Sequence, residues 1–259
     1  MNDLTTLSKN RLVLFALLFV LLAIATVWAT ILKQDTKRPS QEQPTIVTEG
    51  GLTEAQKKHG KLFQAEGRRK KLSSLPDGFT IYIPAEQPDT PTQSEINDSA
   101  LKRTRFQSMV CDADLIIMAV PAKSTTQITE AGDFIFTDYE LIVGDIIRDT
   151  SSTVRSRSIV TLTSPGGSVV LNGKRYRVLD QSFGRLEGGR TYLLFLKFNT
   201  HGSTYQTASK YGTFALNGDR FEPVANNTMP YWVQGIENSS SFIINLRSVA
   251  GSCPEGGVK

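Results

Sequence analysis

Hydrophobic and polar residues divide the chain into regions of different character. Residues 12–32 are almost entirely apolar and carry no charged side chain over 21 positions. A helix of that length rises about 31 Å, at about 1.5 Å per residue, which is enough to cross the hydrocarbon core of a bilayer. The pattern predicts an uncleaved transmembrane signal anchor, preceded by a short cytoplasmic tail over residues 1–11.

A cleaved signal peptide is the alternative interpretation of the same segment. Ala23-Ile24-Ala25 matches a small-x-small cleavage site, and cleavage there would give a secreted or periplasmic protein. The apolar run continues past that site to Leu32, which favours the anchor. Basic residues flank both ends of the run, so their count does not decide its orientation. We expect the C-terminal domain outside the cytoplasm, because this is the commonest arrangement for a short N-terminus followed by one long domain.

Residues 33–93 form a polar and basic spacer with scattered prolines and no sustained apolar periodicity. Within this spacer we expect a helix over 53–72, which Gly60 and Gly67 weaken by about 1 kcal/mol each. A short strand is expected at 79–84.

From residue 94 onward the pattern indicates a folded domain. Apolar residues at helical spacing predict a leading helix over 94–109. After it, short runs rich in β-branched and aromatic residues alternate with turn formers, as in an antiparallel sandwich or barrel. We therefore predict a mainly β domain over 94–253 and a tail over 254–259. The expected strands are 115–120, 133–147, 158–163, 168–171, 175–179, 192–198, 203–208 and 213–216.

The stretch SPGGSVVLNGKRYRV at 164–178 has two interpretations, a phosphate-binding loop or a strand hairpin. A Walker loop has four residues between its first glycine and its Gly-Lys pair and is followed by a helix. Here five residues intervene and a strand follows. The hairpin fits better, because Asn-Gly favours the type I′ turn. A turn at Asn172-Gly173 pairs Val169 with Tyr176 and directs both side chains into the core.

Alternation along these two strands assigns their side chains to two faces. The core face holds Val169, Leu171, Tyr176 and Val178. The mostly solvated face holds Ser168, Val170, Arg175 and Arg177. Gly166-Gly167 is expected to form a bend before the hairpin, and Asn217-Gly218 to join a second pair of strands.

Four segments of the domain carry a family resemblance. They are CDADLIIMAVP at 111–121, FTDYELIVGDIIRD at 136–149, IVTLTSPGGSVVLNGKRY at 159–176 and LEGGRTYLLFLK at 186–197. These segments resemble a group of uncharacterised bacterial exported or membrane-anchored proteins and, more distantly, the netrin-like module of tissue inhibitors of metalloproteinases. The resemblance implies a small antiparallel OB-type barrel of five main strands. In the inhibitors a cysteine at the free mature N-terminus binds the protease zinc, whereas Cys111 is internal. The inhibitory chemistry therefore does not carry over, and the resemblance supplies no catalytic residues.

Charge and cysteine content refine the expected partners. The net charge is +4, and residues 57–71 hold seven Lys or Arg against one acidic residue. This segment is either a solvated polar stretch or a contact for anionic lipid or envelope polymer. An extracytoplasmic domain meets no nucleic acid. Cys111 and Cys253 are candidates for a disulfide, and two free buried thiols are the alternative.

No set of residues in the sequence predicts catalysis, a cofactor site or a metal site. The two histidines, His59 and His201, lie in the basic segment and in a turn. A Ser-His-Asp triad would have to use His201, and no G-x-S-x-G motif accompanies it. Four aspartates without calcium-loop spacing fit strand ends and turns better than a calcium site. They are Asp112, Asp114, Asp133 and Asp138. Late aromatic residues are either a contact patch or part of the core. They are Tyr205, Tyr211, Tyr231 and Trp232.

These observations favour a non-catalytic, membrane-anchored extracytoplasmic domain that binds a protein or envelope partner through its barrel surface. The alternative is a hydrolase that acts on envelope material with a site the sequence does not mark. A protease-inhibitor-like module ranks third, because it would require processing just before Cys111.

Overall fold

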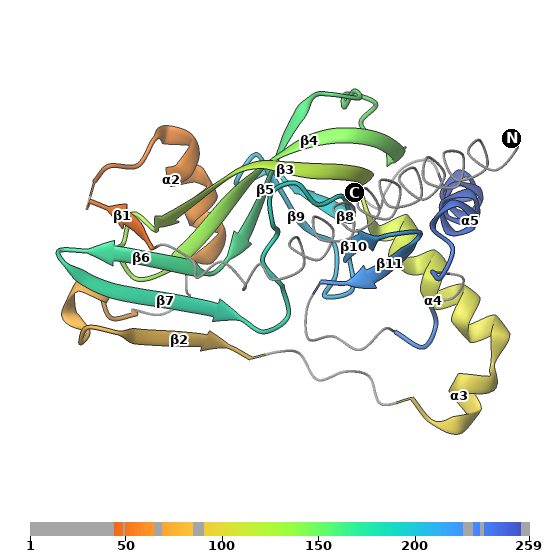
Figure 1. Ribbon diagram of the computed structural model, residues 1–259, viewed down its shortest axis with the longest axis horizontal. Coiled ribbons are helices and arrows are strands. Elements are labelled where there is room, and N and C mark those ends of the chain that lie inside the picture. The colour runs from red at the N-terminus through yellow and green to blue at the C-terminus, as the bar shows by residue number, and fades with distance from the viewer. Residues whose placement is uncertain are drawn as a thin grey trace, which may run out of the picture. The chain divides into compact units, whose positions relative to one another are not determined.

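Figure 1 shows the computed structural model, which describes residues 44–48, 50–64, 69–84, 91–224, 230–233 and 236–254. All of these belong to a compact unit over 43–259, distinct from a second unit over 1–42. The expected anchor at 12–32 and tail at 1–11 lie outside the described residues. Within the described residues, no helix is long and apolar enough to cross a membrane.

The described chain is mainly β, as the sequence predicts. Its larger sheet contains β3 (Leu115–Ile128), β4 (Ile135–Asp149), β5 (Ile159–Pro165), β8 (Tyr192–Asn199), β9 (Thr204–Thr207), β10 (Thr213–Asn217) and β11 (Arg220–Pro223). Strands β8, β3, β4, β5 and β9 pair in that order, and β9 pairs back with β8, so these described strands close a ring. Neighbours in this strand ring are antiparallel except β5 and β9. The hairpin of β10 and β11 extends from β8.

Alternate side chains of the ring strands build its interior. Tyr139, Leu141 and Val143 on β4 belong to one buried cluster with Leu162 of β5 and Leu194 of β8. Burying an aliphatic side chain such as that of Leu141 or Val143 stabilises the folded state by about 1.5–3 kcal/mol. The alternate residues of β4 face the outside of the ring.

Two helices cover the outer side of β3 and β8. They are α4 (Ser99–Asp112) and α5 (Ser239–Gly251), and Phe106 and Phe242 on them share a buried cluster with Ile116 and Phe195. The predicted leading helix is confirmed but divided, because the Asp98 carboxylate caps α4 after the short α3 (Gln93–Asn97). The sequence interpretation did not include α5.

A smaller sheet packs beside the ring. It contains β1 (Thr45–Val47), β6 (Gly167–Leu171), β7 (Lys174–Asp180) and β2 (Phe79–Ile83), in the order β1-β6-β7-β2 (Figure 1). Its outer strands β1 and β2 run parallel to their neighbours. The predicted boundary at residue 94 therefore needs correction, because the folded unit begins near residue 43 and takes two strands from the expected spacer.

The hairpin between β6 and β7 has the predicted register. Val169 pairs with Tyr176, both are buried, and Asn172 and Gly173 adopt positive φ values of 51° and 77°. Ser168 departs from the prediction, because it is buried although it lies on the face expected to be solvated. It follows the bend at Gly167, where the chain leaves β5 and β6 packs close to the ring.

The second hairpin is displaced by one residue from its predicted turn. Asn217 pairs with Arg220, so Gly218 and Asp219 form the two-residue loop. Gly218 has φ of 61°, which suits the first central position of a type II′ turn. Asn217 therefore ends β10 and is not a turn residue.

The helix predicted over 53–72 is wrong beyond its first turns. Thr53 caps α2 (Glu54–Gly60), which continues as the 3₁₀ turn η1 (Lys61–Phe63), and Gln64 is extended. A second 3₁₀ turn, η2 (Leu72–Ser74), follows later in the chain. The helix ends where Gly60 packs against the ring, so that Phe63 can join the core beneath the small sheet.

Candidate functional site

The most varied cluster of buried polar side chains lies where α2 meets the outer wall of the strand ring. His59 on α2 places Nδ1 2.9 Å from Oδ2 of Asp138 on β4, and each residue is only 8% exposed. The Thr163 hydroxyl donates to Asp138 Oδ1 at 2.5 Å and lies 3.0 Å from the Thr204 hydroxyl. Thr204 in turn donates to the carbonyl of Thr161. The network joins α2 to three ring strands.

Close packing holds α2 in place beside this network. A Cβ on Gly60 would lie 3.4 Å from the Phe136 ring, in ordinary contact, and a Cβ on Gly202 would come within 2.9 Å of the Leu62 side chain. The absent side chain at Gly202 makes room for Leu62, which brings η1 close to the loop between β8 and β9. His59 is consequently carried to the ring wall, where its imidazole meets Asp138.

A His–Asp hydrogen bond is also the part of a catalytic triad that orients the imidazole. A triad further requires a nucleophile bonded to the second ring nitrogen. Among the described residues, no hydroxyl or thiol is bonded to His59 Nε2. The network hydroxyl, Thr163, donates to the carboxylate instead. The arrangement therefore fits a polar tether between helix and ring.

The other candidate aspartates lie in separate environments. Asp112 accepts from the Ser108 hydroxyl, Asp133 accepts from the Thr129 hydroxyl, and Asp114 pairs with Lys197. Because only Asp138 joins the His59 network, the four carboxylates do not converge on one cation. Within the described chain, no group of three or more His, Cys, Asp or Glu side chains is placed to hold a metal ion.

His201 lies in the turn after β8, and its backbone N–H donates to the Asn199 side chain. The imidazole is exposed and has no hydrogen bond to another described residue. The sequence pointed to His201 as the histidine that a catalytic triad would use, whereas of the two histidines it is His59 that has a buried hydrogen-bond partner. The sequence separation of 79 between His59 and Asp138 explains why no local pattern marked the pair.

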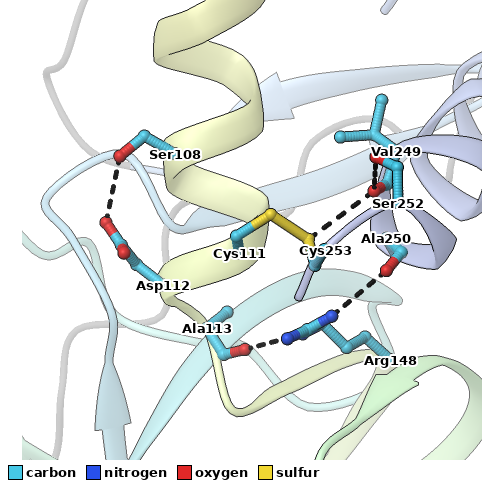
Figure 2. The surroundings of a disulfide bond; sticks show 9 residues. All are labelled: Ser108, Cys111, Asp112, Ala113, Arg148, Val249, Ala250, Ser252 and Cys253. Carbon is cyan, nitrogen blue, oxygen red and sulfur yellow. Dashed lines mark hydrogen bonds between the residues drawn. A yellow bond between two sulfur atoms is a disulfide. The ribbon is translucent and has the colours of Figure 1, made fainter. Parts of the chain in front are cut away.

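Cys111 and Cys253 form a disulfide that joins the C-terminal ends of α4 and α5 (Figure 2). The sequence left open whether these two cysteines are paired or are free buried thiols, and in the structure they are paired. Arg148 of β4 lies beside the bridge and donates to the carbonyl oxygens of Ala113 and Ala250, each at 3.1 Å (Figure 2). A cation at these two helix ends also complements their partial negative charge.

The four late aromatic residues do not form one exposed patch, which corrects that candidate. Trp232 is buried, and its ring meets the edge of Tyr211 at 5.7 Å within the core under α4 and α5. Tyr231 packs against the same core, and Arg105 lies over its ring. Tyr205 belongs to β9 and contacts Phe198, and burial is the main cause that raises the pKa of its hydroxyl. These aromatic rings mainly complete two cores.

Exposed apolar side chains of the described residues include members of two further surfaces. Ile142 and Ile159 are direct partners on β4 and β5, at 42% and 60% exposure, on the outer wall of the strand ring. On the small sheet, Ile46 and Tyr82 are 82% and 61% exposed. An open hollow of about 320 Å³ adjoins Tyr82 and is also lined by Phe183 and Asp180.

The basic segment 57–71 is divided among several structural roles. Lys57 pairs with Glu54 at 2.8 Å, and His59 is buried, whereas Lys58 and Lys61 are exposed. Lys57 and Lys71 line a hollow of about 180 Å³ together with Glu130. The described part of the segment is thus only partly a free basic surface.

Comparison with models of protein families and with curated protein sequences gives no match to the chain. The netrin-like resemblance therefore depends on the residues quoted for it.

Proposed function

We propose that the chain is a membrane-anchored, non-catalytic domain, displayed outside the cytoplasmic membrane, that binds a protein or envelope partner through the outer wall of its strand ring. The observation that carries the proposal is the exposed pair Ile142 and Ile159, side by side on neighbouring strands. Adjacent exposed β-branched residues on a ring wall form an apolar surface, and a bound partner can exclude water from it. The anchor at residues 12–32 supplies the membrane tether.

The strand arrangement supports an OB-type, netrin-like barrel as the fold of this domain. Five strands close on themselves, the first three are consecutive antiparallel neighbours, and the last contact in the ring, β5 with β9, is parallel. A five-stranded Greek-key barrel of this kind binds ligands on its outer wall in many proteins. Fold alone assigns no activity, so the partner surface has to be tested directly.

Site-specific photocrosslinking in cells tests the partner surface. A photoreactive amino acid in place of Ile142 or Ile159 is expected to yield a discrete crosslinked adduct. The matched control is the same substitution at Ile244, an isoleucine of α5 that is 70% exposed. Adducts at all three positions, or at none, would contradict a specific site on the ring wall.

Membrane fractionation tests the tether and the compartment. The full chain is expected to stay in the membrane fraction after alkaline carbonate extraction, and externally added protease is expected to reach its C-terminal domain in spheroplasts. A released chain with a mature N-terminus after Ala25 would establish the secreted alternative. Cytoplasmic protection of the domain would contradict the proposed orientation.

An envelope hydrolase is the second candidate, and the His59–Asp138 hydrogen bond is the observation that favours it. Turnover of envelope material that is lost in His59→Asn and kept in His201→Asn would replace the binding proposal. The inhibitor-like module remains third, because Cys111 lies inside the chain at the end of α4 and is bonded to Cys253.

A further inference from the structure

The outer face of the small sheet combines apolar and cationic side chains. Opposite the core face, the register places Ile46 of β1, Val170 of β6, Arg175, Arg177 and Leu179 of β7, and Tyr82 of β2. We name these six residues the outer sheet face. The remaining two positions of this face are Thr80 and Ser168, of which Ser168 is buried where β6 packs close to the ring. Strands β1 and β2 frame the face, with the hairpin between them (Figure 1).

The apolar side chains of this face are strongly exposed. Ile46 is 82% exposed and Tyr82 is 61% exposed, although the opposite side of the same sheet is packed against Leu72 and Ile135. Val170 is partly exposed between them. An exposed aliphatic residue and an exposed tyrosine on one face are typical of contact with the boundary between lipid headgroups and acyl chains.

The charge of the face is positive. The outer sheet face holds Arg175 and Arg177 and no acidic residue, and neither guanidinium has a hydrogen bond or ion pair with another described residue. Asp77, which precedes β2, accepts a hydrogen bond from the backbone N–H of Arg175 at 2.7 Å and offsets one charge in part. Guanidinium groups bind phosphate oxygens through paired N–H donors, so the face is complementary to phospholipid headgroups.

The position of the face along the chain favours a membrane as its occupant. The expected anchor ends at Leu32 and β1 begins at Thr45, so residues 33–44 connect them. Twelve residues reach at most about 40 Å, the length of the fully extended chain. The edge of the sheet that carries Ile46 is thus confined to the vicinity of the bilayer, which raises its effective concentration there.

We propose that the outer sheet face docks on the surface of an anionic phospholipid bilayer, with Arg175 and Arg177 on lipid phosphates and Ile46 and Tyr82 at the headgroup boundary. This inference rests on the proposed membrane tether. Docking would fix the small sheet against the bilayer and leave the ring wall with Ile142 and Ile159 free for a partner.

The test uses the full chain in nanodiscs of phosphatidylcholine, with or without phosphatidylglycerol, and measures modification of arginines by phenylglyoxal with peptide mass spectrometry. Arg175 and Arg177 are expected to react severalfold more slowly in discs that contain phosphatidylglycerol, and salt is expected to restore their reactivity. Arg155 and Arg157, two exposed arginines of the loop between β4 and β5, are the internal control and should react equally in both discs.

Variants separate the face from general attraction of a basic protein to anionic lipid. Ile46→Ser combined with Tyr82→Ser should remove the protection of Arg175 and Arg177, whereas Ile244→Ser should leave it intact. Because all three side chains are exposed, the variants are expected to fold normally.

The possible results distinguish the membrane tether from the docking of the outer sheet face on lipid. Failure of the chain to purify with discs contradicts the tether. A chain that inserts but leaves Arg175 and Arg177 equally reactive in both discs contradicts docking alone. Protection that appears only when two chains share a disc would assign the face to a second copy, and it too overturns lipid docking.

Discussion

His59 and Asp138 lie 79 residues apart in the sequence and are joined by a hydrogen bond of 2.9 Å between Nδ1 and Oδ2. The bond fastens α2 to a ring strand, and both side chains are buried. His59→Ala would leave a carboxylate buried with fewer partners, which typically costs about 1–3 kcal/mol of unfolding free energy. Urea denaturation measures this decrease in unfolding free energy. His201→Ala, in an exposed turn, is the control and should change stability by less than about 0.5 kcal/mol.

A double-mutant cycle of His59→Ala with Asp138→Ala identifies the contact itself. The two substitutions are expected to be clearly non-additive, because each removes the same hydrogen bond. Additive losses would mean that His59 stabilises the protein through packing beside Gly60 and not through Asp138.

The second prediction concerns where the folded unit begins. A chain that starts at residue 43 should unfold at the same midpoint as the full chain, since it keeps β1, α2 and β2. A chain that starts at residue 94 loses these elements and Leu72, which is fully buried. Loss of one such leucine side chain alone typically costs about 2–5 kcal/mol. We expect the shorter chain to bind the dye ANS and to melt without a cooperative transition; cooperative melting at an unchanged midpoint would contradict the corrected boundary.

Two glycines of the hairpin region give a matched pair for the third prediction. Gly173 has positive φ and open space around its Cα, so Gly173→Ala meets only backbone strain of about 1 kcal/mol. Gly167 also has positive φ, and a Cβ there would collide with the side chains of Thr126 and Thr137. Thermal unfolding should therefore show a clearly larger decrease in midpoint temperature for Gly167→Ala than for Gly173→Ala. Equal losses would mean that the threonines move aside without cost.

The parts of the fold that local chemistry determines were predictable from the sequence. Asn172-Gly173 with alternating Val169, Tyr176 and their neighbours specified a turn and a register, and both are confirmed. The Asn217 turn was displaced by one residue, because Gly218 can occupy either central position of a two-residue loop. Short-range patterns thus placed β6 and β7 to within one residue at each end, whereas β3 continues eight residues beyond the predicted 115–120.

The non-local parts were not predictable from one sequence. Thr45–Val47 has only three residues and becomes a strand because β6 lies beside it. His59 lies in a basic run that gives no sign of a buried partner, and Asp138 lies in a strand with ordinary alternation. Trp232 and Tyr211 were expected as either surface or core, and only tertiary packing assigns them to the core.

The fourth prediction concerns the disulfide between Cys111 and Cys253, which are separated by 142 residues. A crosslink across a loop of this length restricts the unfolded chain and is worth about 5 kcal/mol in the chain-entropy model. Cys111→Ser with Cys253→Ser should lower the urea midpoint strongly, and reduction of the wild-type chain should lower it equally. A wild-type midpoint that does not respond to reductant would contradict a stabilising bridge.

The last prediction concerns the pH dependence of the loop between β4 and β5. Burial alone would raise the pKa of Asp149, but hydrogen bonds from the Ser151 hydroxyl and from backbone N–H groups of Val154, Ser151 and Ser152 outweigh it and hold the pKa below 3.8. The stabilisation is therefore present above pH 3.8 and is lost as the pH falls through the lowered folded-state pKa. The difference in unfolding free energy between wild type and Asp149→Ala should be largest near neutral pH and shrink in acid.

Carboxyl NMR titration checks the cause of the Asp149 shift directly. Ser151→Ala removes a hydroxyl donor at 2.7 Å and should bring the pKa of Asp149 back toward 3.8. Thr153→Ala is the matched control, because its hydroxyl contacts Ser151 and not the carboxylate. A pKa that stays low in Ser151→Ala would show that the backbone N–H groups alone maintain it, and the expected loss of loop stability on acidification would then survive the substitution.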